Sequence, residues 1–248
     1  MGALSIEKDG LTTIFTINRP QERNRLNAEV VEGLREGFAE FDASDQRVAI
    51  ITGAGDKYFS YGMDLAERPV SWHVMPTLGL KTDKPVITAA NGAVVGGSFY
   101  IAVFSDLCVA SESAVFWYPE ARIGISDGMI ATLAARIPHK MAMEVMLLGQ
   151  PVSAQRAYEM GFVNQVVPDG KSLEAALMMA HDLGTCAPLI HRTLKRLVTE
   201  FVLPISPAER AARHEREVEP IFESADCAAG IKWVLDGATG DLPTYLGR

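Results

Sequence analysis

Two glycine-containing turns could supply the backbone donors of an oxyanion hole. The first, F-S-Y-G-M-D-L at 59–65, comes after an apolar strand-like run at 48–51; the second, N-G-A-V-V-G-G-S at 91–98, comes after a similar run at 86–90. Glycine allows close approach to the backbone, and the first N–H groups of a helix lack partners within it. We therefore expect each turn to end a strand and begin a helix. Two free N–H groups converging on one carbonyl oxygen would stabilise an oxyanion, although each turn alone also fits an ordinary strand-to-helix connection.

Acidic and phenolic side chains follow these turns. Glu120 stands beside Arg122 in an expected loop, where a carboxylate is commonly solvated or paired. Tyr100 lies in an apolar helical stretch, and its ordinary pKa of about 10 makes it a poor base, so we expect it to line a pocket or donate a hydrogen bond. Asp127 precedes Gly128 and a predicted helix, so a helix-capping role and an acid role both fit it.

The elements that must position these residues alternate between strands and helices. Residues 6–18 predict a hairpin around a turn at 8–10, and Asn27 is a plausible N-cap for a helix with apolar residues every three to four positions. Further strands are predicted at 48–51, 85–90, 107–110 and 115–118, and helices at 97–104, 129–136, 139–148, 153–160, 171–185, 188–202, 207–223 and 226–236. This order predicts an α/β fold with a C-terminal helical region.

Composition excludes several classes of protein and site. The 248 residues are 48% hydrophobic with a net charge of −8, which argues against nucleic acid as a partner. Cys108, Cys186 and Cys227 are too scattered for a zinc site or a disulfide framework, and we expect no metal. No secretory signal or membrane span is evident, so a cytoplasmic location is expected. The signatures of zincins, P-loop enzymes and α/β-hydrolases are missing.

Seven short motifs follow one another over nearly the whole chain. They are N-R-P-Q-E-R-N-R-L-N at 18–27, F-S-Y-G-M-D-L at 59–65, K-P-V-I at 84–87 with the glycines up to 97, S-D-L at 105–107, P-E with I-G at 119–124, a segment at 153–168, and Ser224, Asp226 and Gly230. In order and spacing they resemble the crotonase superfamily, also called the enoyl-CoA hydratase/isomerase family. The resemblance implies a spiral of ββα turns at 1–190 and a helical trimerisation region at 191–248, within one domain. It also implies a homotrimer or a dimer of trimers.

The resemblance implies a role for each residue that matches a motif. The N–H groups of Met63 and Gly97 would stabilise the enolate of an acyl-CoA thioester, and Glu120 would act as the acid/base residue. Coenzyme A would be part of the substrate, with no tightly bound cofactor. The residues implied to contact it are Arg23, Arg25, Ser60, Gly62, Asp64 and Gly96.

The chain departs from the hydratase pattern at position 100. Hydratases of the family use two glutamates; Glu120 matches the second, but Tyr100 occupies the place of the first. A single carboxylate can move a proton between two carbons, as in the family's Δ3,Δ2-enoyl-CoA isomerases, so isomerisation is predicted over hydration. Asp127 is a further candidate, because dienoyl-CoA isomerases and thioester dehalogenases of the superfamily carry an acid in this region.

Two alternatives remain open at this point. The segment at 236–241 lacks the basic residues that relatives carry there, which leaves room for a CoA-independent β-diketone hydrolase of the same fold. Tyr100 also fits a catalytically silent subunit that serves in binding or assembly.

Overall fold

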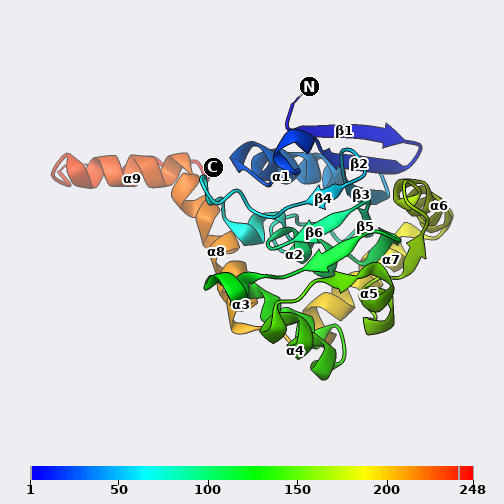
Figure 1. Ribbon diagram of the computed structural model, residues 1–248. Coiled ribbons are helices and arrows are strands. Elements are labelled where there is room, and N and C mark those ends of the chain that lie inside the picture. Colours follow the sequence, from blue (N-terminus) through cyan, green and yellow to red (C-terminus); the bar gives the residue numbers. More distant parts are fainter. Residues whose placement is uncertain (1, 240, 248) are drawn as a thin grey trace. The chain divides into compact units, whose positions relative to one another are not determined.

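The chain divides into two compact units, with the boundary between Ser206 and Pro207 (Figure 1). The computed structural model describes residues 2–239 and 241–247; Met1 and Gly240, which fall in segments interpreted above, lie outside the described residues. Helix α7 (Pro188–Leu197) belongs to the first unit. In the part that the structure describes, no helix is both long and apolar enough to cross a membrane.

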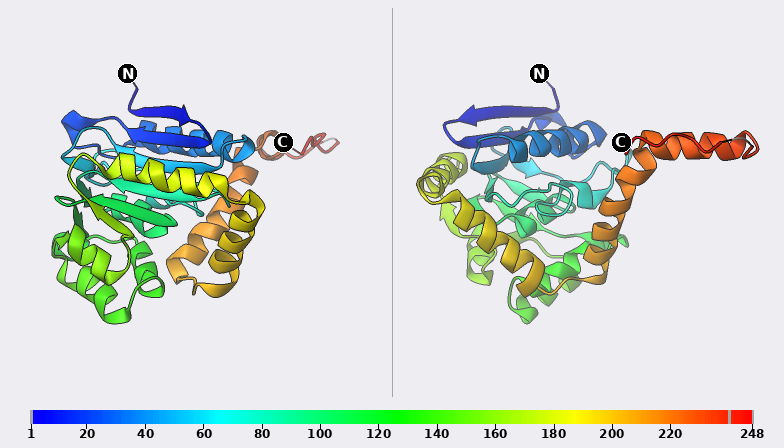
Figure 2. Two further views of the ribbon diagram at one scale, coloured as in Figure 1. Left: turned by 90° about the vertical axis from the view of Figure 1, so that its right-hand side faces the viewer. Right: turned by 180° about the vertical axis from the view of Figure 1, so that it is seen from behind.

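The first unit is built around a six-stranded sheet in the order β1-β2-β3-β5-β7-β10. Its strands are β1 (Leu4–Asp9), β2 (Thr12–Ile17), β3 (Val48–Gly53), β5 (Val86–Ala90), β7 (Leu107–Ser111) and β10 (Gln165–Val167). Only β1 runs antiparallel to its neighbour. Strands β3 and β5 are buried along their whole length, as expected for parallel strands covered on both faces. Figure 2 shows the strands following one another from blue through cyan to green.

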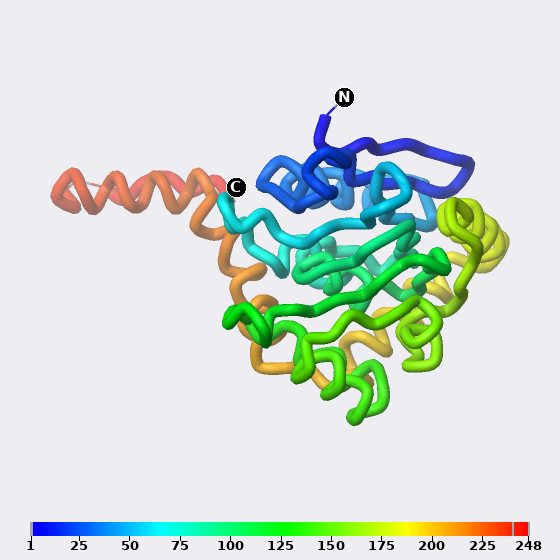
Figure 3. The backbone as a smooth tube through the Cα atoms, viewed as in Figure 1, coloured from blue at the N-terminus to red at the C-terminus, as the bar shows by residue number. Residues whose placement is uncertain are grey.

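A second sheet of four short strands completes the spiral. It contains β4 (Tyr58–Ser60), β6 (Ala93–Val95), β8 (Val115–Trp117) and β9 (Val152–Ser153), in that order. Along the chain, β3 leads to β4, β5 to β6 and β7 to β8, so each turn of the backbone crosses from the large sheet to the small one (Figure 3). The predicted ββα spiral is therefore confirmed.

Helical segments follow these strand pairs and match the predicted helices, except that the expected loop around Glu120 is a single helical turn, Glu120–Ile123. In the first unit they are α1 (Ala28–Ala43), α2 (Ser98–Phe104), α3 (Glu120–Ile123), α4 (His139–Leu148), α5 (Ala154–Met160), α6 (Ser172–Thr185) and α7, with 3₁₀ turns at Pro20–Glu22, Ser71–Val74 and Met129–Ala135 and a π-helical turn at Val198–Val202 after α7. The second unit contains α8 (Pro207–Glu223) and α9 (Ala225–Leu235).

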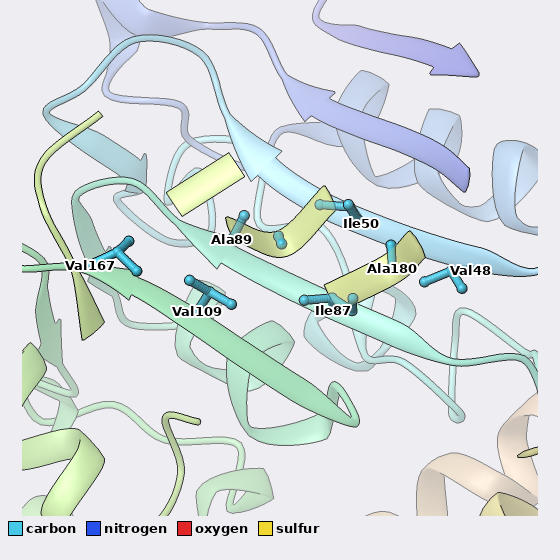
Figure 4. Packing of buried hydrophobic residues seen from close by; sticks show 8 residues of the cluster. Val48, Ile50, Ile87, Ala89, Val109, Val167 and Ala180 are labelled. Atoms are coloured by element: carbon cyan, nitrogen blue, oxygen red, sulfur yellow. The ribbon is translucent and has the colours of Figure 1, made fainter. Parts of the chain in front are cut away.

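Helices α1 and α6 cover the large sheet with apolar faces that the sequence pattern predicts. The Asn27 side chain accepts the Val30 N–H and caps α1, whose Phe38 ring stacks on Phe15 of β2 at 4.5 Å between ring centroids. Ala176 and Ala180 of α6 pack against buried residues of β3, β5, β7 and β10 (Figure 4). Small alanine side chains let α6 approach these strands closely.

One expectation about the first glycine turn is wrong. No helix begins after Leu65; residues 64–70 are irregular, and the next helical segment is the 3₁₀ turn at Ser71–Val74. Arg68 has a left-handed φ of 50°, and Pro69 follows it, which interrupts regular structure. The N–H group that this turn was expected to contribute to the oxyanion hole is therefore not located at a helix N-terminus.

Candidate active site

Both glycine turns border one cavity of about 460 Å³ in the first unit. Its lining comes from Arg25 and from the segments 61–71, 95–100 and 119–127. These segments are far apart in the sequence, but the alternation of the two sheets brings the ends of β4, β6 and β8 together.

The first free amide belongs to Met63. Leu26 donates its N–H to the Gly62 carbonyl and accepts the Asp64 N–H, each at 2.9 Å. Because the N–H groups of an extended segment alternate in direction, the intervening Met63 N–H points away from Leu26. Within the described chain, the Met63 N–H donates no hydrogen bond.

The second free amide belongs to Gly97, the residue that caps the N-terminus of α2. Its N–H also donates no hydrogen bond to any described residue. A Cβ atom added to Gly97 would lie 3.6 Å from the Met63 nitrogen and 2.5 Å from the Met63 Cγ, so the two residues are in direct contact. At Gly62, φ is 88° and a Cβ would lie 2.7 Å from the Val95 carbonyl oxygen. Gly62 therefore requires glycine, whereas a side chain at position 97 would have to displace the Met63 side chain.

Hydrogen bonds hold the two turns in register. The Ser98 hydroxyl donates to the Ser60 carbonyl at 2.8 Å, and the Ser60 hydroxyl accepts the Gly62 N–H at 3.2 Å. Ser60 is completely buried, so its side chain shapes the loop from behind the cavity wall. The Gly96 N–H donates to the Trp117 carbonyl at 2.9 Å and ties this turn to β8.

Glu120 lies at the start of α3 and reaches the second turn. Its Oε1 atom would be 3.0 Å from a Cβ atom on Gly96, which places the carboxylate beside the turn that carries Gly97. Its Oε2 atom is buried and has no hydrogen-bond partner among the residues that the structure describes. Burial raises the pKa of Glu120 to about 7, and the nearby Asp127 carboxylate adds to this effect. A carboxyl group with such a pKa can take up and release a proton near neutral pH.

Tyr100 and Asp127 lie together at the same cavity. The buried Tyr100 hydroxyl donates to Asp127 Oδ1 at 2.6 Å, and Asp127 also accepts the Ser71 hydroxyl and the Met129 N–H. Met129 is the first residue of the 3₁₀ turn at 129–135, whose N-cap is Gly128, so Asp127 supports the start of this turn from the position before the cap. Burial raises the pKa of Tyr100 far above its usual range, and Tyr118 and Asp127 raise it further. The Tyr100 hydroxyl group is therefore neutral near pH 7.

The residues expected to contact coenzyme A are divided between the cavity and its surroundings. Arg25, like Gly62 and Gly96, lines the cavity. The Arg23 guanidinium lies 5.0 Å from the centroid of the Tyr61 ring, which is part of the lining. Asp64 lies 3.8 Å from the Arg19 guanidinium, and its carboxylate accepts the Ala66 N–H.

Some cavity residues escaped the sequence reasoning altogether. Ser71 begins the short 3₁₀ turn at 71–74, and Ser126 lies between two motifs, so neither position carries a signal before the chain is folded. Arg68 also lines the cavity, and its charge is the only hint in the sequence that it could meet a ligand. In the described residues, no three His, Cys, Asp or Glu side chains gather as metal ligands.

Comparison with known proteins shows the family. The family model described as "Enoyl-CoA hydratase/isomerase" matches residues 7–233. The chain belongs to the enoyl-CoA hydratase/isomerase family. A carnitinyl-CoA dehydratase of Salmonella typhi is 35% identical over 208 residues, which cover 79% of each protein.

Solved structures of this family share the whole fold. A carnitinyl-CoA hydratase from Mycobacterium avium superposes with a TM-score of 0.76 at 32% identity, and the enoyl-CoA hydratase EchA1 from Mycobacterium marinum superposes with 0.75 at 32% identity; each match covers 100% of both chains. As a crotonase-type member of the enoyl-CoA hydratase/isomerase family, the protein is an enzyme of the class that acts on CoA thioesters.

Proposed function

We propose that the protein acts on an acyl-CoA thioester through an enolate, with the N–H groups of Met63 and Gly97 as oxyanion donors and Glu120 as the single acid/base residue. One observation carries the proposal: two amides without hydrogen-bond partners in the described chain lie beside each other at a cavity that also contains Glu120. An N–H pair of this kind stabilises a thioester oxygen most strongly when it becomes negative.

The proposed reaction is the shift of a double bond along the acyl chain. The Glu120 carboxylate takes a proton from C2 of a 3-enoyl thioester, and the electron pair of the broken C–H bond delocalises onto the thioester oxygen. The Met63 and Gly97 amides hold that charge. Glu120 then returns the proton to C4, the double bond forms between C2 and C3, and the carboxylate is restored. The raised pKa of Glu120, near 7, suits both the uptake and the release of this proton.

The cations at the cavity support a coenzyme A ester as the substrate. Arg25 and Arg68 both line it, and guanidinium groups bind phosphate well. The relatives described above are named for CoA thioesters, which favours a CoA ester over a free β-diketone. The free donors and the poised carboxyl group favour an active enzyme over a silent subunit.

Hydration or dehydration of the acyl chain is a second candidate. It is favoured by the names of the relatives, which are hydratases and dehydratases. Water addition in this family is shared by two carboxylates, and Asp127 is another carboxylate that lines the cavity beside Glu120.

A panel of acyl-CoA esters incubated in deuterated water and analysed by mass spectrometry tests the proposal. Isomerisation moves the double bond of a 3-enoyl-CoA without adding the mass of water, whereas hydration adds one water molecule. Glu120→Gln is expected to lower turnover at least about 1,000-fold, while Glu112→Gln, at an exposed glutamate outside the cavity, is the matched control and keeps wild-type turnover. Full activity of Glu120→Gln would refute the role of Glu120, and hydration at a higher rate than isomerisation would favour the second candidate.

We also propose that the enzyme assembles as a homotrimer or a dimer of trimers. The first unit exposes large apolar side chains along α7 and the π-helical turn, including Leu189 (73% exposed) and Phe201 (74% exposed). An apolar face of this kind is typical of subunit interfaces. Light scattering coupled to size-exclusion chromatography is expected to give three or six times the chain mass of 26.9 kDa, and a monomeric mass would refute the proposal.

A further inference from the structure

Tyr100 contacts the chain on both sides of Glu120. It lies on α2, three residues after Gly97, and is only 3% exposed. Its hydroxyl group is 2.6 Å from Asp127 Oδ1, seven residues after Glu120, and 3.1 Å from the hydroxyl group of Tyr118, two residues before Glu120. One side chain on the helix of the oxyanion donor therefore holds both ends of the segment that carries the acid/base residue.

The direction of these hydrogen bonds follows from the groups involved. An ionised carboxylate only accepts, so Tyr100 donates its single proton to Asp127. The Tyr100 oxygen then accepts the proton of Tyr118, and the Tyr118 oxygen, 3.2 Å from the Ser126 hydroxyl, accepts in turn. Ser71 donates to Asp127 from the other side. The Tyr118, Tyr100 and Ser71 hydroxyl groups each donate their proton to another member of the network, and Asp127 is the final acceptor.

Apart from β8, whose Trp117 carbonyl accepts the Gly96 N–H, the segment around Glu120 makes few contacts that hold it against α2. Helix α3 is a single turn, and all residues from 121 to 128 are exposed. Arg122 anchors the segment elsewhere, because its Nε donates to the Leu148 and Gly149 carbonyls at the end of α4. A segment with few buried contacts opens easily, so its position relative to α2 depends on the remaining hydrogen bonds.

We propose that Tyr100 and Asp127 form a latch that positions Glu120 against the Gly97 end of α2, and that the substrate exchanges its proton with Glu120 alone. The role given to Glu120 rests on the proposed function. Tyr100 is thus a positioning residue in a place where the family's hydratases carry a catalytic glutamate. Its hydroxyl proton is donated to Asp127, and the Asp127 carboxylate accepts two further hydrogen bonds, so both groups are engaged with the chain itself.

Three variants separate the latch from a direct catalytic role. Tyr100→Phe removes the hydroxyl group with almost no change in volume, Asp127→Ala removes the acceptor, and Asp127→Asn keeps an oxygen acceptor but loses the charge. If the latch positions Glu120, the first two lower kcat about 10- to 100-fold with little change in KM, because a small misplacement of a catalytic group costs this much. Asp127→Asn is then expected to restore kcat to within about threefold of the wild type, since its amide oxygen still accepts from Tyr100.

The double variant Tyr100→Phe/Asp127→Ala is expected to be no slower than the slower single variant, because both changes break the same hydrogen bond. If the losses of kcat in the two single variants multiply in the double variant, Tyr100 and Asp127 do not act through one shared hydrogen bond. An Asp127→Asn variant as slow as Asp127→Ala would overturn the latch and make the charge of Asp127 part of the chemistry.

Hydrogen exchange measured by mass spectrometry tests the latch without relying on turnover. Peptides that cover 119–128 are expected to exchange about tenfold faster in Tyr100→Phe and Asp127→Ala than in the wild type, and at the wild-type rate in Asp127→Asn. Peptides from α4 serve as an internal control. If exchange changes in this way but no acyl-CoA is converted, the latch holds and the proposed function fails. If exchange at 119–128 does not change in Tyr100→Phe, the latch is refuted whatever the activity.

Discussion

Glu120→Gln is expected to stabilise the protein at pH 8 while it abolishes turnover. The folded protein holds the pKa of Glu120 at about 7, against 4.5 for the ordinary side chain, because burial disfavours the ionised form. A carboxyl group whose pKa is raised on folding lowers the stability of the protein when it ionises. This cost is complete once the pH exceeds the pKa in the folded state. The wild type therefore loses stability as the pH rises from about 4.5 to 7, and the neutral glutamine does not.

The size of this effect follows from the shift. Each pKa unit corresponds to about 1.36 kcal/mol, so the gain from Glu120→Gln reaches about 3 kcal/mol at pH 8 and stays below about 1 kcal/mol at pH 5. Glutamine also buries an amide where Oε2 has no partner, but that cost is the same at both pH values and cancels in their difference.

Urea unfolding of both proteins at pH 5 and pH 8, at one fixed protein concentration, measures this difference directly. Glu112→Gln, at an exposed site, is the control for the loss of one negative charge. A stability difference between Glu120→Gln and the wild type that does not depend on pH would refute the claim that folding raises the pKa of Glu120.

Three further predictions concern catalysis and the glycine turns. Because Glu120 must be ionised to accept a proton, kcat/KM is expected to fall about tenfold per pH unit below 7 and to level off above it, and a flat pH profile would contradict this. Gly97→Ala places a methyl group against Met63 Cγ, so steady-state kinetics should show kcat reduced at least about 100-fold; wild-type kcat would argue against the proposed donors. Gly62→Ala combines a left-handed φ with a clash against the Val95 carbonyl, and should lower the free energy of unfolding by about 2–4 kcal/mol; an unchanged melting temperature would contradict this.

The sequence predicts five of the six strands of the large sheet and the long helices, because their signals are local; the three-residue strand β10 is missed. Strands β3 and β5 are continuous apolar runs, and α1 has a capping asparagine before its apolar periodicity. The small sheet is harder to predict, because β4 and β6 have three residues each and are too short to show an alternating pattern. They pair with each other only because successive turns of the spiral place them side by side.

Some features of the candidate site can likewise be predicted from local sequence signals, and others cannot. Gly97 follows from a strand and a helix that the sequence predicts, and its free N–H follows from the helix N-terminus. The free N–H of Met63 has a different cause, the pairing of Leu26 with the residues on either side, which no local pattern reveals. The contact between Tyr100 and Asp127 joins residues 27 positions apart through a hydrogen bond that only the folded chain shows.

The state of the thioester carbonyl in the bound substrate tests the central claim most directly. An infrared difference spectrum of a Glu120→Gln complex with an acyl-CoA labelled with carbon-13 at the carbonyl reports the hydrogen bonds to that oxygen without turnover. If the Met63 and Gly97 amides both donate to it, its stretching frequency lies below the value in water, and Gly97→Ala reduces the shift. A carbonyl frequency equal to that of the free thioester in water would contradict the account.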